Sequence, residues 1–213
     1  MTKFLIFDFD GVLVDSEILA STIEAQVKTE MGFPISLDEQ IHKFTGTHAT
    51  HPVQVEERKR LPENYIEVVH QRIYTKYKEE LKPIPGTTEF LSQLKIPHAV
   101  ASSSSGDGLE LKLAITNLKK YFGDQVFNND MVQNCKPAPD LYIHALKTMG
   151  WNADDGYAIE DSVPGVTAAR GAGLKVIGFI GGGHVREGHG ERLLQAGAIR
   201  LIKNLNELIG KEI

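Results

Sequence analysis

The chain has 213 residues, of which 23 are basic and 28 acidic, and its formal net charge is -5. Neither sign forms a long run, which argues against a nucleic-acid partner because such a partner requires a basic patch. The only cysteine, Cys135, excludes an intrachain disulfide, and no apolar run approaches the ~20 residues that cross a bilayer. Residues 1–3 lead directly into a short apolar run, so we expect no signal peptide. These features predict a cytoplasmic monomer without a membrane or nucleic-acid partner.

The first predicted element is a strand over residues 4–7, whose unbroken apolar run is typical of a strand buried on both faces. Asp8 and Asp10 follow it at a spacing that points both side chains to the same side. Gly11 permits a sharp turn just beyond them. Two carboxylates held together are unfavourable unless a cation lies between them or their pKa values separate. The pattern therefore predicts a ligand site at the carboxyl end of this strand, where open α/β sheets bind ligands.

Helical signals replace strand signals over residues 16–82. Apolar side chains recur every four residues across 19–31, and a capping box at 36–39 opens a second, shorter helix toward Phe44. A loop at 45–51 follows, and a long apolar stripe then covers 61–81. An uninterrupted helical stretch between two strands predicts a small, separate helical domain.

The segment Pro83-Ile84-Pro85-Gly86 ends the helical pattern, and strands alternate with helices from there on. Strands are predicted at 98–101, 125–127, 156–159, 174–179 and 199–202, and helices at 87–94, 107–119, 139–149, 166–171, 191–196 and from 204. This alternation predicts a parallel sheet with helices on both faces. We therefore expect a doubly wound α/β core formed by 1–15 and 84–213, with an all-helical domain inserted at 16–83.

Two polar side chains follow the next predicted strands. Ser102 comes directly after the strand at 98–101, where a hydroxyl and the N–H groups of the following helix can hold phosphate oxygens. Lys136 precedes Pro137, and a residue before proline is held extended, so its ammonium group is directed rather than free. Either residue alone is also compatible with an ordinary surface role, so the argument depends on their combination with the two aspartates.

An acidic pair, Glu160 and Asp161, ends the strand at 156–159. Mg²⁺ binds an octahedron of oxygen ligands, usually a few carboxylates together with water. Another acidic pair, Asp154 and Asp155, precedes the same strand. It should lie at the opposite edge of the sheet, so we assign it no role.

Taken together, these segments resemble the four motifs of the haloacid dehalogenase (HAD) superfamily. Asp8 to Ser16 match the first motif nearly letter for letter, and Ser102 matches the second. Lys136 with the following Pro-Ala-Pro-Asp matches the third, and Glu160-Asp161-Ser162 with Gly165 matches the fourth. The resemblance covers most of the predicted core and is closest to the branch of the phosphoglycolate phosphatases and β-phosphoglucomutases. It implies a Rossmann-like HAD core with a helical cap inserted after the first motif.

The resemblance implies a phosphatase that acts on a small phosphorylated metabolite, such as a sugar phosphate or a sugar-acid phosphate, through an aspartyl-phosphate intermediate. Asp8 would attack phosphorus, and Asp10 would be the general acid and base. Ser102 and the N–H of Ser103 would hold the phosphate, and Lys136 would offset charge. A sugar alkoxide is a poor leaving group, so a proton from Asp10 suits this chemistry.

Mg²⁺ is the implied cofactor, because a carboxylate that attacks a phosphate dianion is repelled by it. The implied ligands are Asp8, the backbone carbonyl of Asp10, and Asp161, with Glu160 acting through water. A dehalogenase that acts on carbon would not need an acid at Asp10, so a phosphatase is the better expectation.

Two other functions stay open. A β-phosphoglucomutase-like enzyme shares all four motifs, but such mutases usually carry a histidine five residues beyond Asp15, where this chain has Ala20. They also carry an arginine in the cap loop, and residues 45–51 contain none. A non-catalytic metabolite-binding regulator would not need to retain every motif residue.

Substrate specificity is expected to depend on the cap, where Phe44, His48 and His51 are the candidate substrate-binding residues. His184 and His189 are five residues apart in a later loop and could join His48 and His51 in a metal site. No cysteine or carboxylate at helical spacing supports zinc there, so we assign these two histidines no role.

Overall fold

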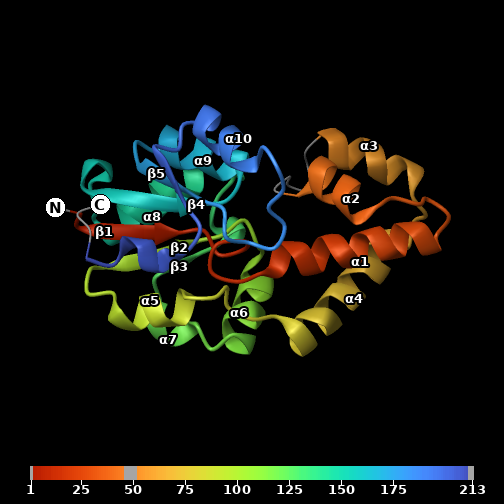
Figure 1. Cartoon of the computed structure of the whole chain (residues 1–213), viewed down its shortest axis with the longest axis horizontal. Helices are drawn as coiled ribbons and strands as arrows, with labels where there is room; N and C mark the ends of the chain where they lie inside the picture. Colours follow the sequence, from red (N-terminus) through yellow and green to blue (C-terminus); the bar gives the residue numbers. More distant parts are fainter. Residues whose placement is uncertain (1, 46–51, 211–213) are drawn as a thin grey trace.

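The computed structural model describes residues 2–45 and 52–210 (Figure 1). Within this part of the chain, six strands form one parallel sheet in the order β3-β2-β1-β4-β5-β6. The strands are β1 (Phe4–Phe7), β2 (His98–Ala101), β3 (Val126–Phe127), β4 (Gly156–Glu160), β5 (Lys175–Phe179) and β6 (Arg200–Ile202). The strand order reverses between β1 and β4, because the sheet grows from β1 through β2 on one side and from β4 on the other, and open α/β sheets bind ligands at such a point. The predicted α/β fold is confirmed.

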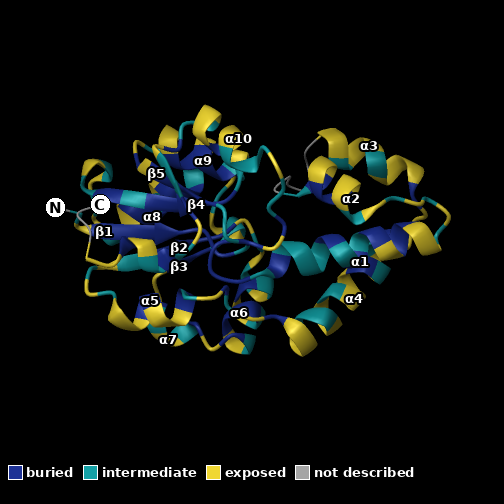
Figure 2. Cartoon of the chain, viewed as in Figure 1, coloured by how far each residue is buried: buried dark blue, intermediate teal, exposed yellow. Residues whose placement is uncertain are grey.

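Alternate side chains of β1 pack into two separate cores, one on each face of the sheet. Leu5 and Phe7 join the core under α5 (Thr87–Gln93), α6 (Gly106–Ile115) and α7 (Lys119–Phe122). Phe4 and Ile6 join the core under α8 (Asp140–Met149), α9 (Val163–Gly171) and α10 (His189–Ala196). Three short 3-10 segments, η1 (Asn129–Met131), η2 (Ala153–Asp155) and η3 (Leu205–Leu208), complete the connections. Figure 2 shows the result, a sheet of mostly buried residues between two helical layers with exposed outer faces.

Four helices lie beyond the carboxyl edge of the sheet rather than on its faces (Figure 1). They are α1 (Ser16–Glu30), α2 (Leu37–Phe44), α3 (Pro52–Arg60) and α4 (Tyr65–Glu80). They have an apolar cluster of their own, centred on Ile23, Val27 and Val69. Among the described residues, no helix is both long enough and apolar enough to span a bilayer.

The two connecting segments that join these helices to the sheet are hydrogen-bonded to each other. The N–H of Asp15 donates to the carbonyl of Lys82 over 3.2 Å, and the N–H of Ile84 donates to the carbonyl of Leu13 over 2.9 Å. Outgoing and returning connectors therefore form one paired neck.

Local signals predicted most element boundaries well, and the differences have simple causes. The capping box is present, with the N–H of Glu39 donating to Oγ of Ser36 over 3.2 Å. Helix α3 was not predicted, because none of its residues is buried and it therefore has no apolar stripe. The stripe at 61–81 extends past α4 at both ends, since Leu61 and Leu81 are buried just outside the helix. The helix expected at 107–119 ends earlier, at Ile115, and a separate short helix, α7, begins at Lys119.

Candidate active site

The four motifs converge at the carboxyl edge of the sheet, around the end of β1. Asp8 follows β1, Ser102 follows β2, and Asp161 follows β4. Gly11 allows this convergence, because its φ is +78° and a Cβ there would lie 1.9 Å from Oδ2 of Asp161. Both the positive φ and the close approach exclude other residue types.

Lys136 joins the carboxylates at the ends of two neighbouring strands, β1 and β4. Its Nζ donates hydrogen bonds to Oδ1 of Asp8 over 2.8 Å, to the carbonyl of Ala101 over 2.8 Å, and to Oε1 of Glu160 over 2.6 Å. The hydroxyl of Tyr142 donates to the same oxygen of Glu160 over 2.6 Å. Burial opposes the charge of Lys136, but the carboxylates of Asp8 and Glu160 outweigh burial and raise its pKa. The ammonium group is therefore fixed and charged next to Asp8.

Asp8, Glu160 and Asp161 form a buried acidic group that fits a metal ion. Each can offer an oxygen atom, and these atoms lie within 4.8 Å of one another. Burial raises the pKa of Asp8 to about 7, with Lys136 lowering it and Glu160 raising it further. Burial and the charge of Asp8 also raise the pKa of Asp161 well above its usual value. Three carboxylates share one ammonium, so the group lacks positive charge and suits a divalent cation such as Mg²⁺.

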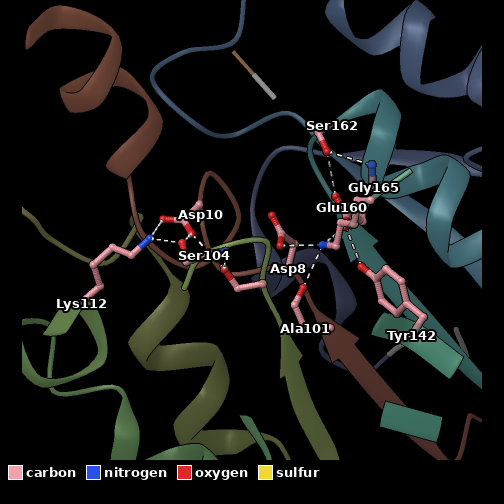
Figure 3. Close-up of polar contacts among 11 residues, drawn as sticks. Asp8, Asp10, Ala101, Ser104, Lys112, Tyr142, Glu160, Ser162 and Gly165 are labelled. Carbon is pink, nitrogen blue, oxygen red and sulfur yellow. Dashed lines mark hydrogen bonds and ion pairs between the residues drawn. The ribbon is translucent and has the colours of Figure 1, made fainter. Parts of the chain in front are cut away.

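Asp10 points away from this acidic group, into a separate set of donors (Figure 3). Its Oδ1 accepts from Oγ of Ser16 over 2.5 Å and pairs with Nζ of Lys112. Its Oδ2 accepts from Oγ of Ser104 over 2.8 Å and from Oγ of Ser102 over 3.1 Å. Burial acts to raise the pKa of Asp10, but the Lys112 ammonium and these hydroxyls lower it below its usual value. The two aspartates of the first motif are thus held by different lysines.

A cavity of about 270 Å³ lies between this edge of the sheet and helices α1, α2 and α4. Asp8, Asp10 and Ser103 line it on the sheet side, and Phe44, a candidate substrate-binding residue, lines it on the helix side. The hydroxyl of Ser102 is completely buried and bonded to Asp10 in this structure. The other two specificity candidates, His48 and His51, lie outside the described residues.

Three further side chains belong to this region, although the motifs did not identify them. Lys112 holds Asp10, and Tyr142 holds Glu160. Nε2 of His184 lies 3.1 Å from Oδ2 of Asp161. Of these, Lys112 carried a usable signal, since it shares the buried face of its helix with Leu109 and Leu113.

The second histidine of that loop also lies here. Nε2 of His189 is 2.6 Å from the backbone carbonyl of Asp161, and the rings of His184 and His189 pack edge to face. Burial lowers the pKa of both histidines, which favours neutral rings beside the acidic group.

Comparison with known proteins places this geometry in a family. A model of the haloacid dehalogenase-like hydrolases matches residues 5–179. The chain is 33% identical to a phosphorylated carbohydrates phosphatase from Thermotoga maritima over 93% of each chain. It is 29% identical to a 6-phosphogluconate phosphatase from Escherichia coli, over 84% of this chain and 82% of the relative. A solved haloacid dehalogenase-like protein from Agrobacterium tumefaciens has a TM-score of 0.88 and 35% identity, covering 98% of this chain and 96% of that one. This chain therefore belongs to the haloacid dehalogenase-like hydrolases and is a phosphatase.

Proposed function

We propose that the chain is a Mg²⁺-dependent phosphatase that hydrolyses a phosphorylated carbohydrate through an aspartyl-phosphate on Asp8. The observation that carries this proposal is the position of Asp8, which faces the cavity while Lys136 Nζ holds its Oδ1 at 2.8 Å. The names of two relatives, a phosphorylated carbohydrates phosphatase and a 6-phosphogluconate phosphatase, support the substrate class.

In the proposed reaction each step is assigned to a residue of this site. A carboxylate oxygen of Asp8 bonds to phosphorus while the bond from phosphorus to the sugar oxygen breaks, and Asp10 gives its proton to that oxygen. Water then attacks phosphorus and gives a proton to Asp10, and the carboxylate of Asp8 is released with inorganic phosphate. Mg²⁺, held by Asp8, Asp161 and the backbone carbonyl of Asp10, would neutralise charge on the phosphoryl oxygens. Glu160 would contribute through water and by holding Lys136.

Lys112 suits the second of these steps. Its ammonium stabilises the ionised form of Asp10, which is the form that accepts the proton of the attacking water. A phosphate ester in the cavity would compete with Asp10 for this ammonium, because Lys112 also lines the cavity. Asp10 could then retain a proton for the first step.

The same proposal gives residues 16–83 the role of a cap over the site. Phe44 on α2 lines the cavity opposite Asp8, and His48 and His51 follow it in the chain. We propose that these three residues contact the leaving group, while the N–H of Ser103 and the hydroxyl of Ser102 hold the phosphate. Ser102 would have to exchange its hydrogen bond to Asp10 for one to the phosphate.

One residue of the cavity lining favours hydrolysis over a mutase reaction. Ala20 lines the cavity, at the position where the resemblance to β-phosphoglucomutases calls for a histidine. A methyl group cannot exchange protons with a sugar hydroxyl, so this position offers no acid or base for a mutase reaction.

Phosphate release from a panel of phosphorylated sugars, with the isomerisation of glucose 1-phosphate measured in parallel, tests the proposal. We expect hydrolysis in the presence of Mg²⁺, and Asp8→Asn should abolish it because an amide cannot form the acyl phosphate. Asp154→Asn is the matched control, since Asp154 is exposed before β4 at the other end of the strand. Isomerisation without phosphate release, or hydrolysis that survives Asp8→Asn in a pure sample, would refute the proposal.

A further inference from the structure

Two histidines that follow β5, His184 and His189, contact the same residue, Asp161. Nε2 of His184 lies within hydrogen-bond distance of the carboxylate, 3.1 Å from Oδ2. Nε2 of His189 lies 2.6 Å from the backbone carbonyl of Asp161. The two rings pack edge to face, with their centres 5.5 Å apart and an interplanar angle of 83°. One imidazole therefore meets the side chain of Asp161, and the other meets its main chain.

The partners of the two rings determine which ring nitrogen carries the hydrogen. A carbonyl oxygen only accepts, so Nε2 of His189 must donate, and its Nδ1 can accept from the guanidinium of Arg192 at 3.4 Å. An ionised carboxylate, which is the form that binds a cation, also only accepts, so Nε2 is the nitrogen of His184 that carries hydrogen. Burial lowers the pKa of both histidines. Each ring is therefore neutral, and its one N–H faces Asp161.

The ring of His184 is fixed by the chain around it. A Cβ at Gly11 would lie 2.9 Å from Cε1 of this ring, and a Cβ at Gly182 would lie 2.8 Å from the same atom. Only glycine leaves room for the imidazole at these two positions. The N–H of the preceding residue, Gly183, donates to Oδ1 of Asp15 over 2.8 Å and anchors the loop beside the ring. The contact between His184 and Asp161 thus has little freedom to change.

Stability of the fold does not by itself account for a histidine at this position. Nδ1 of His184 is buried and has no hydrogen-bond partner in the described part of the chain. A buried polar atom without a partner costs free energy, which an apolar side chain of similar size would avoid. What the histidine provides in return is the N–H that faces Asp161.

A donor on Oδ2 affects how Asp161 meets a cation. Groups that hydrogen-bond to metal ligands fix the orientation of those ligands, and loss of such a group typically lowers metal affinity about 10–100-fold. Mg²⁺ requires a near-ideal octahedron, whereas Ca²⁺ accepts more oxygens in a flexible arrangement and binds carboxylates through one oxygen or two. A carboxylate that has one oxygen occupied by an N–H therefore suits Mg²⁺ better than Ca²⁺.

We propose that His184 is a positioning residue for the cation site, because its Nε2–H holds Oδ2 of Asp161 and leaves one oxygen for the cation. The site then favours Mg²⁺ over Ca²⁺. His189 supports the same residue through its backbone carbonyl. This inference rests on the proposed Mg²⁺-dependent function and adds to the site two residues that lie outside the four motifs.

Isothermal titration calorimetry of the metal-free protein with Mg²⁺ and with Ca²⁺ tests this inference. His184→Leu retains an apolar side chain of similar size but has no donor. It should stay folded and bind Mg²⁺ about 10–100-fold more weakly, with a smaller loss for Ca²⁺ because Ca²⁺ accepts a less ordered carboxylate. His184→Gln should recover much of the Mg²⁺ affinity, since its amide N–H can donate to the same oxygen.

The matched control is His98→Leu. His98 also packs edge to face on an aromatic ring, that of Phe122, and its two ring nitrogens also lie near backbone carbonyls. It begins β2 and so lies at the opposite edge of the sheet from the cation site. His98→Leu should lower the melting temperature and leave the affinity for both cations unchanged.

Circular dichroism shows whether each variant is folded before titration, and His184→Ala takes the place of His184→Leu if the latter does not fold. Unchanged Mg²⁺ affinity in the folded variant, or an equal loss in His184→Gln, would overturn this inference alone. Equal losses for Mg²⁺ and Ca²⁺ would overturn the assigned preference between the cations. If the unsubstituted protein bound no Mg²⁺, the metal requirement of the proposed function would fail together with the inference.

Discussion

Tyr142 offers a direct test of how the buried lysine and carboxylates are held together. Its hydroxyl donates a 2.6 Å hydrogen bond to Glu160, and both side chains are completely inaccessible to solvent. Tyr142→Phe removes a single oxygen atom and retains the ring in the core on that face of the sheet. The substitution therefore isolates one donor to a buried carboxylate.

The expected loss can be worked from the contact. A hydrogen bond to a charged group contributes about 1.5–3 kcal/mol, and no water can replace the lost donor at a fully buried oxygen. For a chain of this size, each kcal/mol lowers the melting temperature by about 2–4 °C, so we expect a fall of about 3–12 °C. Differential scanning calorimetry of the metal-free protein measures it. Because Glu160 also holds Lys136, kcat should fall while KM changes little.

The matched control is Tyr74→Phe, which removes the same atom from a side chain on α4 that is 40% exposed. Its melting temperature should stay within about 1 °C of the unsubstituted protein, as surface substitutions usually do. If Tyr142→Phe had the same melting temperature as Tyr74→Phe, the hydroxyl of Tyr142 would not stabilise Glu160 and the reasoning would be wrong.

Three more predictions concern the same edge of the sheet. Mg²⁺ at 100 times its Kd should add about 2.7 kcal/mol to the free energy of unfolding and so raise the melting temperature. EDTA should abolish hydrolysis. A melting temperature unaffected by Mg²⁺ would argue against the cation site. Asp10→Asn should slow sugar phosphates about 10²–10⁴-fold more than 4-nitrophenyl phosphate in burst kinetics, since a nitrophenolate leaves without a proton; equal losses would remove Asp10 as the acid. Gly165→Ala should destabilise the fold, because its Cβ would lie 1.9 Å from Oε2 of Glu160; Gly108→Ala, whose Cβ would meet only Oγ of Ser105 at 3.1 Å, is the control for thermal melting.

The convergence of the motif residues could be predicted from sequence because it depends on one regularity. Parallel strands begin at one edge of a sheet and end at the other, so Asp8, Ser102 and Asp161 had to meet once their strands were recognised. The same rule placed Asp155 at the opposite edge, where it pairs with Lys3 at 3.0 Å.

Side chains that support the site through a helix face were harder to find, although some signals existed. Lys112 falls on the buried face of α6, and Glu17 and Glu24 share a face of α1 with Ser21. A charged residue at an apolar or shared helical position indicates a buried partner. The identity of that partner depends on packing between segments far apart in the chain, which periodicity does not encode.

His184 shows where local reasoning ends. It lies in an irregular loop 23 residues beyond Asp161, yet its ring is 1% exposed and its Nε2 is 3.1 Å from that carboxylate. No spacing rule connects a loop histidine to a strand end. Its two glycine neighbours allow the close approach, since a Cβ at Gly11 or Gly182 would lie within 3 Å of the ring.

The bond from Ser16 to Asp10 has a mechanical consequence. Ser16 is the first residue of α1, and its carbonyl accepts a 3.5 Å hydrogen bond from the hydroxyl of Tyr77 on α4. A rotation of these helices about the paired neck at Leu13 and Ile84 would therefore pull on a donor to the proposed acid. Any such rotation would change the proton affinity of Asp10, so the position of the proposed cap and the strength of the proposed acid are linked through one hydroxyl.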